Sequence, residues 1–446
     1  SAARQAARAM NKPALLLAAG ALLALVQQQL LLQRPPRLLE LHSSTASSGP
    51  AALSLRFSRP MDRASLAERS QLQPALPHQW LGANNPLRLL LAANQPITGA
   101  IQLLISGVDQ RGLALRPQRW SWDPRPRLLA VVPKGSGEQL QLLQHDGSWQ
   151  PLSPEFERIT AVTPLGDGSA IALASRDAQG ERLWLLPLEQ SSLQRGGQPG
   201  SRAVKAGPLR ALLPEPLIFT HLSSNQRGDL LVQWSAQALG RSITSFWPRQ
   251  GNRQQLELEA SGPMQLLPDG GALVMPELEG LSLRNLPGRP ERRQLLPGSR
   301  DLSSFCPVSG RALLVRHWPD FRRSLELVEP GQPPRQLWLG GDAVLSTACD
   351  RGGERVWLLV SHWRDVQHIR LLEINRLGQI VRARDLTGWE VEPGVPMAYD
   401  PTRQQLLLTL RQQGRPDAQP VLIAVRDLTL QPLAKAVRQA LWLPPG

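Results

Sequence analysis

The sequence is poor in the residues that build most catalytic and metal sites. Its 446 residues include two Cys, one Tyr and seven His. Two Cys are too few for a thiolate metal cage, and no His pair has the HExxH spacing that holds zinc. The G-x-S-x-G elbow of serine hydrolases and the lysine loop of nucleoside triphosphatases are also absent. We therefore predict no catalytic, cofactor-binding or metal-binding residue, and a protein that is not an enzyme is favoured.

Lysine is scarce as well, and nearly all basic residues are Arg. Lys and Arg total 50 against 36 Asp and Glu, which gives a net charge of +14. A basic chain can bind nucleic acid or an anionic membrane face. However, the basic residues form no run, and six Phe and one Tyr supply no platform on which bases could stack. We expect no nucleic-acid partner, and binding of nucleic acid or a cell-wall polymer through Arg stays an alternative hypothesis.

Proline and glycine are abundant, with 41 and 36 residues spread along the chain. Pro and Gly at this frequency interrupt long helices and favour short strands joined by turns. The length of the chain predicts two or three domains. Residue usage is rich in Gln, Leu, Arg and Trp and poor in Lys and Tyr, which is similar to cyanobacterial proteins. An extracytoplasmic domain would then lie in the periplasm or the thylakoid lumen.

The longest apolar run is near the N-terminus. Residues 14–26 are uninterrupted apolar, and Pro13–Leu32 is long enough to cross ~30 Å of hydrocarbon as a helix. No small-x-small cleavage site follows residue 26, so residues 1–37 are interpreted as an uncleaved signal anchor with one transmembrane helix. A soluble amphipathic helix is the alternative. The run is preceded by three basic residues that favour a cytoplasmic N-terminus: Arg4, Arg8 and Lys12.

Residues 38–123 contain short alternating strands separated by turn signals every 8–12 residues, the pattern of a β-sandwich. Within them, "LSLRFSRPMD" is followed by a strand that contains Trp80 and by an Asp109-x-x-Gly112 turn. These motifs resemble the bacterial immunoglobulin-like domain of the S-layer-protein type over about 85 residues. The resemblance implies an extracytoplasmic spacer module. We expect Met61 to pack inward and Asp62 to accept bonds from backbone N–H groups at the turn.

Residues 124–446 repeat a turn followed by an apolar strand. The seven copies begin at Arg125, Gly166, Arg227, Asp269, Ser309, Gly352 and Thr402. Their spacing is near 40 residues, with one gap near 60 that holds the insertion "EQSSLQRGGQPGSRAVKAGP". This period predicts a β-propeller of about seven blades, which resembles WD40-like and YVTN-like propellers. The predicted fold class is therefore all-β: a transmembrane helix, an immunoglobulin-like sandwich and a propeller.

One local repeat could form a site at the rim of the ring. "VRHWPD" and "VSHWRD" would place two His–Trp–Asp groups on adjacent blades. Such groups could bind a ligand or a metal, but descent from a common repeat explains them as well, with each Trp packed between blades. The candidate rim residues are His317, Trp318, Asp320, His362, Trp363 and Asp365.

The two Cys stand at matching places in the same two repeats, because Cys306 and Cys349 each lie four residues before a turn Gly. In an oxidising compartment, neighbouring strands could bring them into disulfide range. Two buried thiols on well-separated inner strands are the alternative.

These patterns together favour a membrane-anchored scaffold or accessory subunit of a membrane complex, with its β domains in the periplasm or thylakoid lumen. The anchor would attach the protein to the membrane, the sandwich would act as a spacer, and the propeller would bind protein subunits. The alternative is a propeller-based enzyme or small-ligand sensor with a site in the central channel. The sequence shows no cluster of ionisable residues that converges there, so no cofactor is expected.

Overall fold

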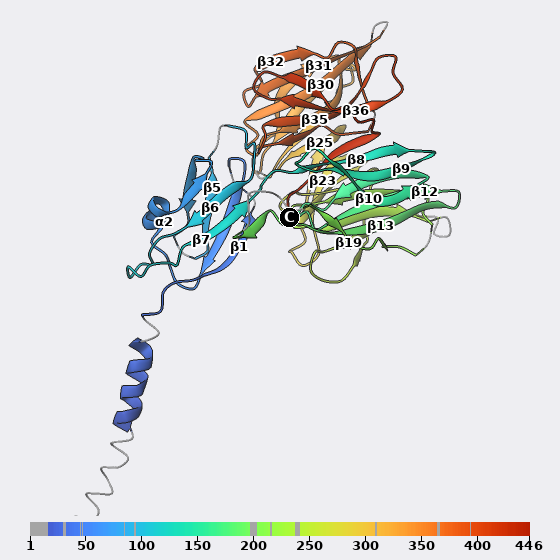
Figure 1. The fold of residues 1–446 in the computed structure, drawn as a ribbon. Coiled ribbons are helices and arrows are strands. Elements are labelled where there is room, and N and C mark those ends of the chain that lie inside the picture. The colour runs from blue at the N-terminus through green and yellow to red at the C-terminus, as the bar shows by residue number, and fades with distance from the viewer. Residues whose placement is uncertain are drawn as a thin grey trace, which may run out of the picture.

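The computed structural model describes residues 17–29, 33–44, 46, 48–83, 85–92, 95–196, 203–214, 216–236, 241–307, 310–363, 366–392 and 394–446. In this part of the chain the fold is all-β apart from two short helices. Figure 1 shows the parts in chain order: an N-terminal helix, a small sandwich and a large ring of sheets.

The N-terminal helix covers residues 17–29, and its apolar side chains are exposed. No helix in the described ranges is both long enough and apolar enough to cross a membrane. The predicted span, Pro13–Leu32, also includes residues 13–16 and 30–32, which lie outside the described ranges.

The sandwich packs two four-stranded sheets around one apolar core. Alternation places Leu53, Leu55 and Phe57 in that core, as expected for a half-buried strand. The first sheet contains, in spatial order, β1 (Leu38–Ser44), β2 (Ala52–Phe57), β5 (Leu87–Leu91) and β4 (His78–Leu81). The second contains β14 (Leu193–Arg195), β7 (Gln118–Trp122), β6 (Ile101–Ile105) and β3 (Gln71–Gln73).

The "RPMD" motif that follows β2 joins two distant turns of the sandwich. Met61 is buried in the core and forms a β-bridge with Asp109, which lies in the predicted Asp-x-x-Gly turn. Asp62 accepts hydrogen bonds from Ala64 N and Ser65 N, so its carboxylate caps helix α2 (Arg63–Arg69). The expected roles of Met61 and Asp62 are therefore confirmed, whereas the sequence reading did not anticipate the short helix.

Seven further sheets in the described residues form the blades of a propeller. The first strands of neighbouring blades contact one another around the ring axis. Blade 1 contains β38 (Gln439–Leu443), β8 (Arg127–Lys134), β9 (Gly137–Leu143) and β10 (Trp149–Phe156). Blade 2 contains β11 (Arg158–Pro164), β12 (Ala170–Asp177), β13 (Gly180–Glu189) and a split fourth strand, β15 (Lys205–Ala206) and β16 (Arg210–Ala211).

Blades 3 to 5 each have four antiparallel strands in sequence order. Blade 3 contains β17 (Phe219–Ser224), β18 (Leu230–Ser235), β19 (Ile243–Trp247) and β20 (Gln254–Leu256). Blade 4 contains β21 (Gln265–Leu266), β22 (Ala272–Glu277), β23 (Gly280–Asn285) and β24 (Arg293–Pro297). Blade 5 contains β25 (Arg300–Cys306), β26 (Arg311–His317), β27 (Arg323–Val328) and β28 (Arg335–Gly340).

The last two blades follow the same order, except that blade 7 has its first strand in two pieces. Blade 6 contains β29 (Ala343–Cys349), β30 (Arg355–Trp363), β31 (Gln367–Asn375) and β32 (Ile380–Asp385). Blade 7 contains β33 (Trp389–Val391), β34 (Ala398–Asp400), β35 (Gln405–Gln412), β36 (Ala418–Ala424) and β37 (Thr429–Pro432).

The seven repeats seen in the sequence are the second strands of the seven blades. These strands are covered on both faces by neighbouring blades, so they read as nearly continuous apolar runs. Leu231, Leu314 and Leu358, which we expect at mid-strand core positions, are all buried, as predicted.

The insertion after β13 contributes a strand to the sandwich. Its strand β14 pairs antiparallel with β7, so a segment from the propeller half of the sequence completes a sheet of the sandwich. Ser192 N donates to Gly446 O, and Asp123 N donates to Ser192 O, which ties this segment to both domains. The sandwich is therefore joined to the ring by strand pairing as well as by the linker.

Candidate functional site

Several turns between the first and second strands of the blades have the same hydrogen-bond pattern. An Asp or Asn side chain accepts hydrogen bonds from later backbone N–H groups: Asp167 from Ser169, Asn225 from Arg227, and Asp350 from Glu354. A Gly with φ between +63° and +80° follows in five blades: Gly168, Gly228, Gly270, Gly310 and Gly353. Because strands alternate in direction, all these turns lie on one side of the ring, here named the turn face. The hairpins between second and third strands lie on the opposite side, the hairpin face.

The sandwich lies over the turn face and leaves a cleft of about 670 Å³ between the two domains. Strand β1 and Trp120 line it on the sandwich side. On the other side, six of the seven blades contribute lining residues, so the cleft extends over most of the turn face. The lining residues include, from blades 1, 2, 3, 5, 6 and 7 in turn, Trp442, Asp167, Gln226, Pro307, Arg351 and Tyr399.

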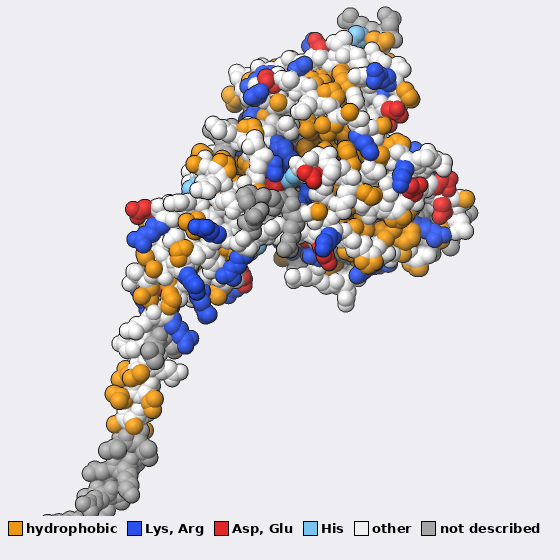
Figure 2. Space-filling model, in the orientation of Figure 1, with side chains coloured by type: hydrophobic (Ala, Val, Ile, Leu, Met, Phe, Trp, Pro, Cys, Tyr) orange, Lys and Arg blue, Asp and Glu red, His pale blue; other side chains and the backbone are white. Residues whose placement is uncertain are grey.

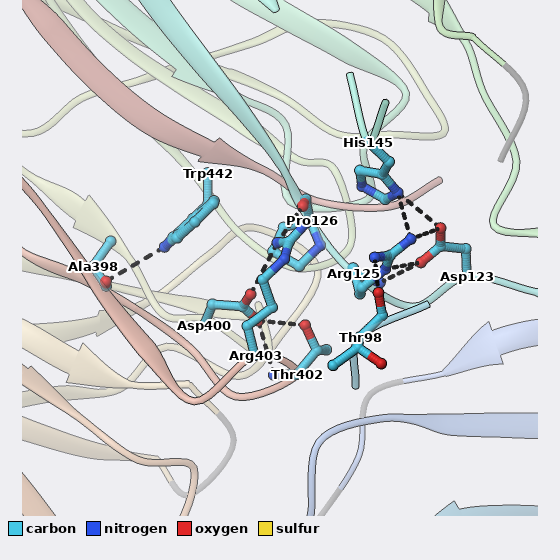
Figure 3. A network of polar contacts seen from close by, with 10 residues as sticks. All are labelled: Thr98, Asp123, Arg125, Pro126, His145, Ala398, Asp400, Thr402, Arg403 and Trp442. Carbon is cyan, nitrogen blue, oxygen red and sulfur yellow. Dashed lines mark hydrogen bonds and ion pairs between the residues drawn. The ribbon is translucent and has the colours of Figure 1, made fainter. Parts of the chain in front are cut away.

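A buried ion cluster lies at the joint between the domains (Figure 3). Asp123, at the end of the sandwich, accepts two bonds of 2.8 Å from the Arg125 guanidinium and one of 2.8 Å from His145 Nδ1 of blade 1. Arg125 also donates to Thr98 O at 2.6 Å. Burial alone would raise the pKa of Asp123, but hydrogen bonds and charge from Arg125 and His145 hold it well below its usual range. The cluster therefore fixes the linker against both domains.

Replacing Asp123 with Asn should lower the free energy of unfolding by about 2 kcal/mol near neutral pH, the worth of hydrogen bonds to a charged group. Because the folded pKa of Asp123 is depressed, the carboxylate stabilises the protein fully above the usual carboxyl pKa of about 3.9, and this contribution is lost as the pH falls toward the folded pKa. Denaturant unfolding at several pH values measures the difference. The exposed Asp417→Asn variant is the matched control, and a difference independent of pH would contradict the role given to the charge.

A second ion pair closes the cleft floor from blade 7 (Figure 3). The buried Asp400 accepts from Thr402 N at 2.8 Å and from Arg403 Nη1 at 3.1 Å. Arg403 Nη1 also donates to Pro126 O at 2.7 Å, and Thr402 O accepts from Ile97 N of the sandwich at 2.8 Å. These contacts link blade 7 to the linker and to the sandwich, so their geometry indicates a structural clamp.

Arg351 extends from the first turn of blade 6 into the sandwich. Its two terminal nitrogens donate to Ala46 O at 3.3 Å and to Pro50 O at 3.0 Å. Burial lowers the pKa of the Arg351 guanidinium, while the nearby Asp400 carboxylate opposes that change. Tyr399 is beside it, and burial raises the pKa of its phenol to about 12. Both side chains line the cleft, and neither has the arrangement of an acid–base pair.

A disulfide joins Cys306 at the end of β25 to Cys349 at the end of β29, with 5.3 Å between the Cα atoms. These are the first strands of blades 5 and 6. Ser304 and Thr347 side chains hydrogen-bond across the same two strands at 2.6 Å. Pro307 and Arg351, which line the cleft, come one and two residues after the cysteines, so the bridge fixes this part of the cleft wall.

The structure places the candidate rim residues of blade 5 on the hairpin face, away from the cleft. His317 Nε2 is 2.7 Å from Asp301 Oδ2, and Asp320 is paired with the adjacent Arg322 at 2.6 Å. The Trp318 ring lies 3.9 Å from the Arg316 guanidinium carbon and donates from Nε1 to Ser324 Oγ. Each of these polar groups therefore has a bonding partner within blade 5.

In blade 6, His362 stacks on His368 with ring centroids 5.1 Å apart, and its Nδ1 is 3.9 Å from Asp342 Oδ1. Trp363 is 72% exposed, so it does not pack between blades as the repeat-descent interpretation expected. Asp365 lies outside the described residues. The described part of the chain contains no group of three or more His, Cys, Asp or Glu placed to hold a metal ion.

Large apolar side chains project from the hairpin tips of three consecutive blades. Leu278 of blade 4 is 98% exposed, Phe321 of blade 5 is 89% exposed, and Trp363 of blade 6 is 72% exposed. Sequence reasoning found Trp363 but not the other two, because one apolar residue in a turn carries no periodic signal. Contiguous exposed apolar surface is typical of a site that contacts another molecule, whereas single exposed apolar residues are common on any protein.

On the face shown in Figure 2, Lys and Arg lie on both the sandwich and the ring, among apolar and some acidic side chains. Many Arg side chains pair with carboxylates, as Arg300 does with Glu326 at 2.7 Å and Arg376 with Glu329 at 2.7 Å.

No protein-family model matches the chain, and no curated protein matches it either. Similar solved structures include TolB from Acinetobacter baumannii, at 12% identity, with 82% of each chain covered and a TM-score of 0.41. Apo AztD from Citrobacter koseri matches at 10% identity, covering 72% of this chain and 99% of that one, with a TM-score of 0.45. The β-propeller domain of the Trilobed protease from Pyrococcus furiosus matches at 9% identity, covering 76% and 93%, with a TM-score of 0.45.

This chain is a seven-bladed β-propeller with a β-sandwich docked on its turn face. That assignment rests on the strand order within the described residues. At identities of 9–12% and TM-scores of 0.41–0.45, the similar structures assign no activity, ligand or partner to it.

Proposed function

We propose that this protein is a membrane-tethered, extracytoplasmic scaffold that binds a protein partner through the hairpin face of its propeller. The observation that carries the proposal is the row of exposed apolar tips, Leu278, Phe321 and Trp363, on three consecutive blades. Aromatic and large aliphatic anchors are the side chains that dominate protein–protein contacts. The candidate rim residues His317, Trp318, Asp320 and His362 lie on the same two hairpins as Phe321 and Trp363 and would form the polar border of this surface.

The arrangement of the domains supports this division of roles. The sandwich covers the turn face, so the hairpin face is the side of the ring that points away from it (Figure 1). The N-terminal helix projects from the sandwich on the side away from the ring. A tether at that helix would leave the hairpin face free for a partner, with the sandwich acting as a spacer of the bacterial immunoglobulin-like type.

Two features support placement outside the cytoplasm. The Cys306–Cys349 disulfide fits an oxidising compartment such as the periplasm or the thylakoid lumen. The helix over residues 17–29 exposes Leu17, Leu22, Leu23 and Leu25, which is costly in water and favourable in lipid. We propose that it belongs to a signal anchor with a cytoplasmic N-terminus.

The alternative, an enzyme or small-ligand sensor in the central channel, has less support. The Asp and Arg side chains at the cleft are engaged: Asp400 with Arg403, Asp167 with Arg249 at 2.7 Å, and Arg351 with two backbone carbonyls. Catalytic groups are usually placed where a substrate can reach them, whereas these groups hold the domains together.

The proposal is tested with the full-length chain expressed in its native membranes, solubilised in mild detergent and resolved by native electrophoresis and mass spectrometry. We expect the wild-type chain to migrate as a complex and the triple variant Leu278→Ser, Phe321→Ser, Trp363→Ser to lose at least about tenfold of the co-purifying partner, which corresponds to about 1.4 kcal/mol.

Leu377→Ser is the matched control, because Leu377 is 75% exposed but lies in the β31–β32 turn on the turn face. This variant should retain the partner. A wild-type chain that migrates only as a monomer, or a triple variant that retains the complex, would overturn the proposal.

A further inference from the structure

At the side of the sandwich that faces the ring, the second sheet gains a strand from the propeller, whereas the first sheet gains none among the described residues. In the second sheet, the edge beside β7 is covered by β14 from the propeller. In the first sheet, β1 is the edge strand and pairs only with β2 in the described sheet order. Four of its seven residues, Leu41 to Ser44, line the cleft. An edge strand without a neighbour presents a row of unpaired backbone N–H and C=O groups.

The apolar core of the sandwich is also incompletely covered at this side. Leu41, Trp120 and Leu193 pack against the core but are only partly buried, and all three line the cleft. Two polar atoms there, Trp120 Nε1 and Ser44 Oγ, are buried without a hydrogen-bond partner among the described residues. A strand placed beside β1 would cover the exposed parts of the three apolar side chains.

We propose that the cleft binds an extended, uncharged peptide segment of a partner protein, which adds to β1 as a further strand of the first sheet. Main-chain hydrogen bonds to an open sheet edge give such binding its affinity, and alternate side chains give it specificity. The chain itself uses the same device one sheet away, where β14 completes the edge beside β7. The proposed strand would continue that existing contact between sandwich and ring.

The chemistry of the cleft favours an uncharged segment over a charged small ligand. The Asp and Arg side chains that line its described walls, Asp167, Asp400 and Arg351, are each held by an ion pair or by backbone carbonyls. A phosphate or carboxylate would have to displace one of these contacts. Apolar side chains of a strand would instead meet Leu41, Trp120 and Trp442. The cleft volume of about 670 Å³ lies within the ~300–1,000 Å³ typical of ligand sites.

The test is amide hydrogen exchange of the full-length protein with and without the uncharged synthetic peptide acetyl-Thr-Val-Thr-Val-Thr-Val-Thr-amide at about 1 mM. We expect the amides of β1 to exchange at least about tenfold more slowly with the peptide, because strand pairing protects them. Strand β4 is the internal control, since it forms the opposite edge of the same sheet and does not line the cleft. No protection of β1, or equal protection of β4, overturns the proposal.

A second peptide and two variants separate strand addition from other binding. The same peptide with N-methyl groups on all of its internal backbone nitrogens keeps its side chains but cannot donate hydrogen bonds along either edge. Equal protection of β1 by this peptide would overturn the proposal. Leu41→Asp should abolish the protection, whereas Leu39→Asp, at a 52% exposed position of the same strand, should retain it. This assay does not involve the hairpin tips, so its failure leaves the proposed function standing.

Discussion

Replacing Leu443 with Asp should open the propeller ring and remove its cooperative unfolding transition. Leu443 is 1% exposed and pairs with Arg127 of β8, so it sits in the strand β38 that completes blade 1 from the far end of the chain. The carboxylate would lie opposite the buried Arg127 within an apolar cluster, where the desolvation of a buried ion pair can exceed its Coulombic gain, and the packing of the leucine side chain would be lost. Together these costs are about 5 kcal/mol, and the alternative is to release β38 and expose β8 as an open edge.

The measurement is far-ultraviolet circular dichroism and denaturant unfolding of purified protein. Ile380→Asp is the matched control, because Ile380 is an apolar residue of an outer strand, β32, and is 53% exposed. It should change the free energy of unfolding by less than about 0.5 kcal/mol. A Leu443→Asp protein as stable as the control would show that β38 is not needed to close the ring.

Removing the disulfide with the double variant Cys306→Ala, Cys349→Ala should lower the free energy of unfolding by about 4 kcal/mol. The bridge closes a loop with a sequence separation of 43 residues, and the chain-entropy argument assigns about this amount to a loop of that length. Both positions are buried, so the alanine side chains also leave a small cavity. The loss should appear as faster opening between blades 5 and 6.

Reductant provides the control for this prediction. It should destabilise the wild-type protein by a similar amount and leave the double variant unchanged. Thiol labelling of the denatured wild-type chain without reductant should find no free thiol. Two labelled thiols under these conditions would show that the bridge is absent and would also remove one support for an extracytoplasmic location.

Local patterns in the sequence determined the blade count and most of the core. A second strand covered on both faces is apolar along most of its length, and in four blades a turn with Asp or Asn and Gly precedes it. These features recur about every 40 residues, so seven blades and the burial of Leu231, Leu314 and Leu358 follow from the repeat alone. The "RPMD" motif likewise predicted the roles of Met61 and Asp62, because both depend on neighbours within a few residues or on simple apolarity.

The tertiary structure alone decided how the two domains meet. Strand β14 is three residues of an insertion with no periodicity, and only its position beside β7 makes it part of the sandwich. The Asp123–His145 contact, the Arg351 contacts and the closing pair β38–β8 join residues 22 to more than 300 positions apart. Such contacts depend on where the whole ring places its turns, and one sequence holds no local signal for them. The cleft exists because of these long-range contacts, which is why residue patterns pointed to the rim instead.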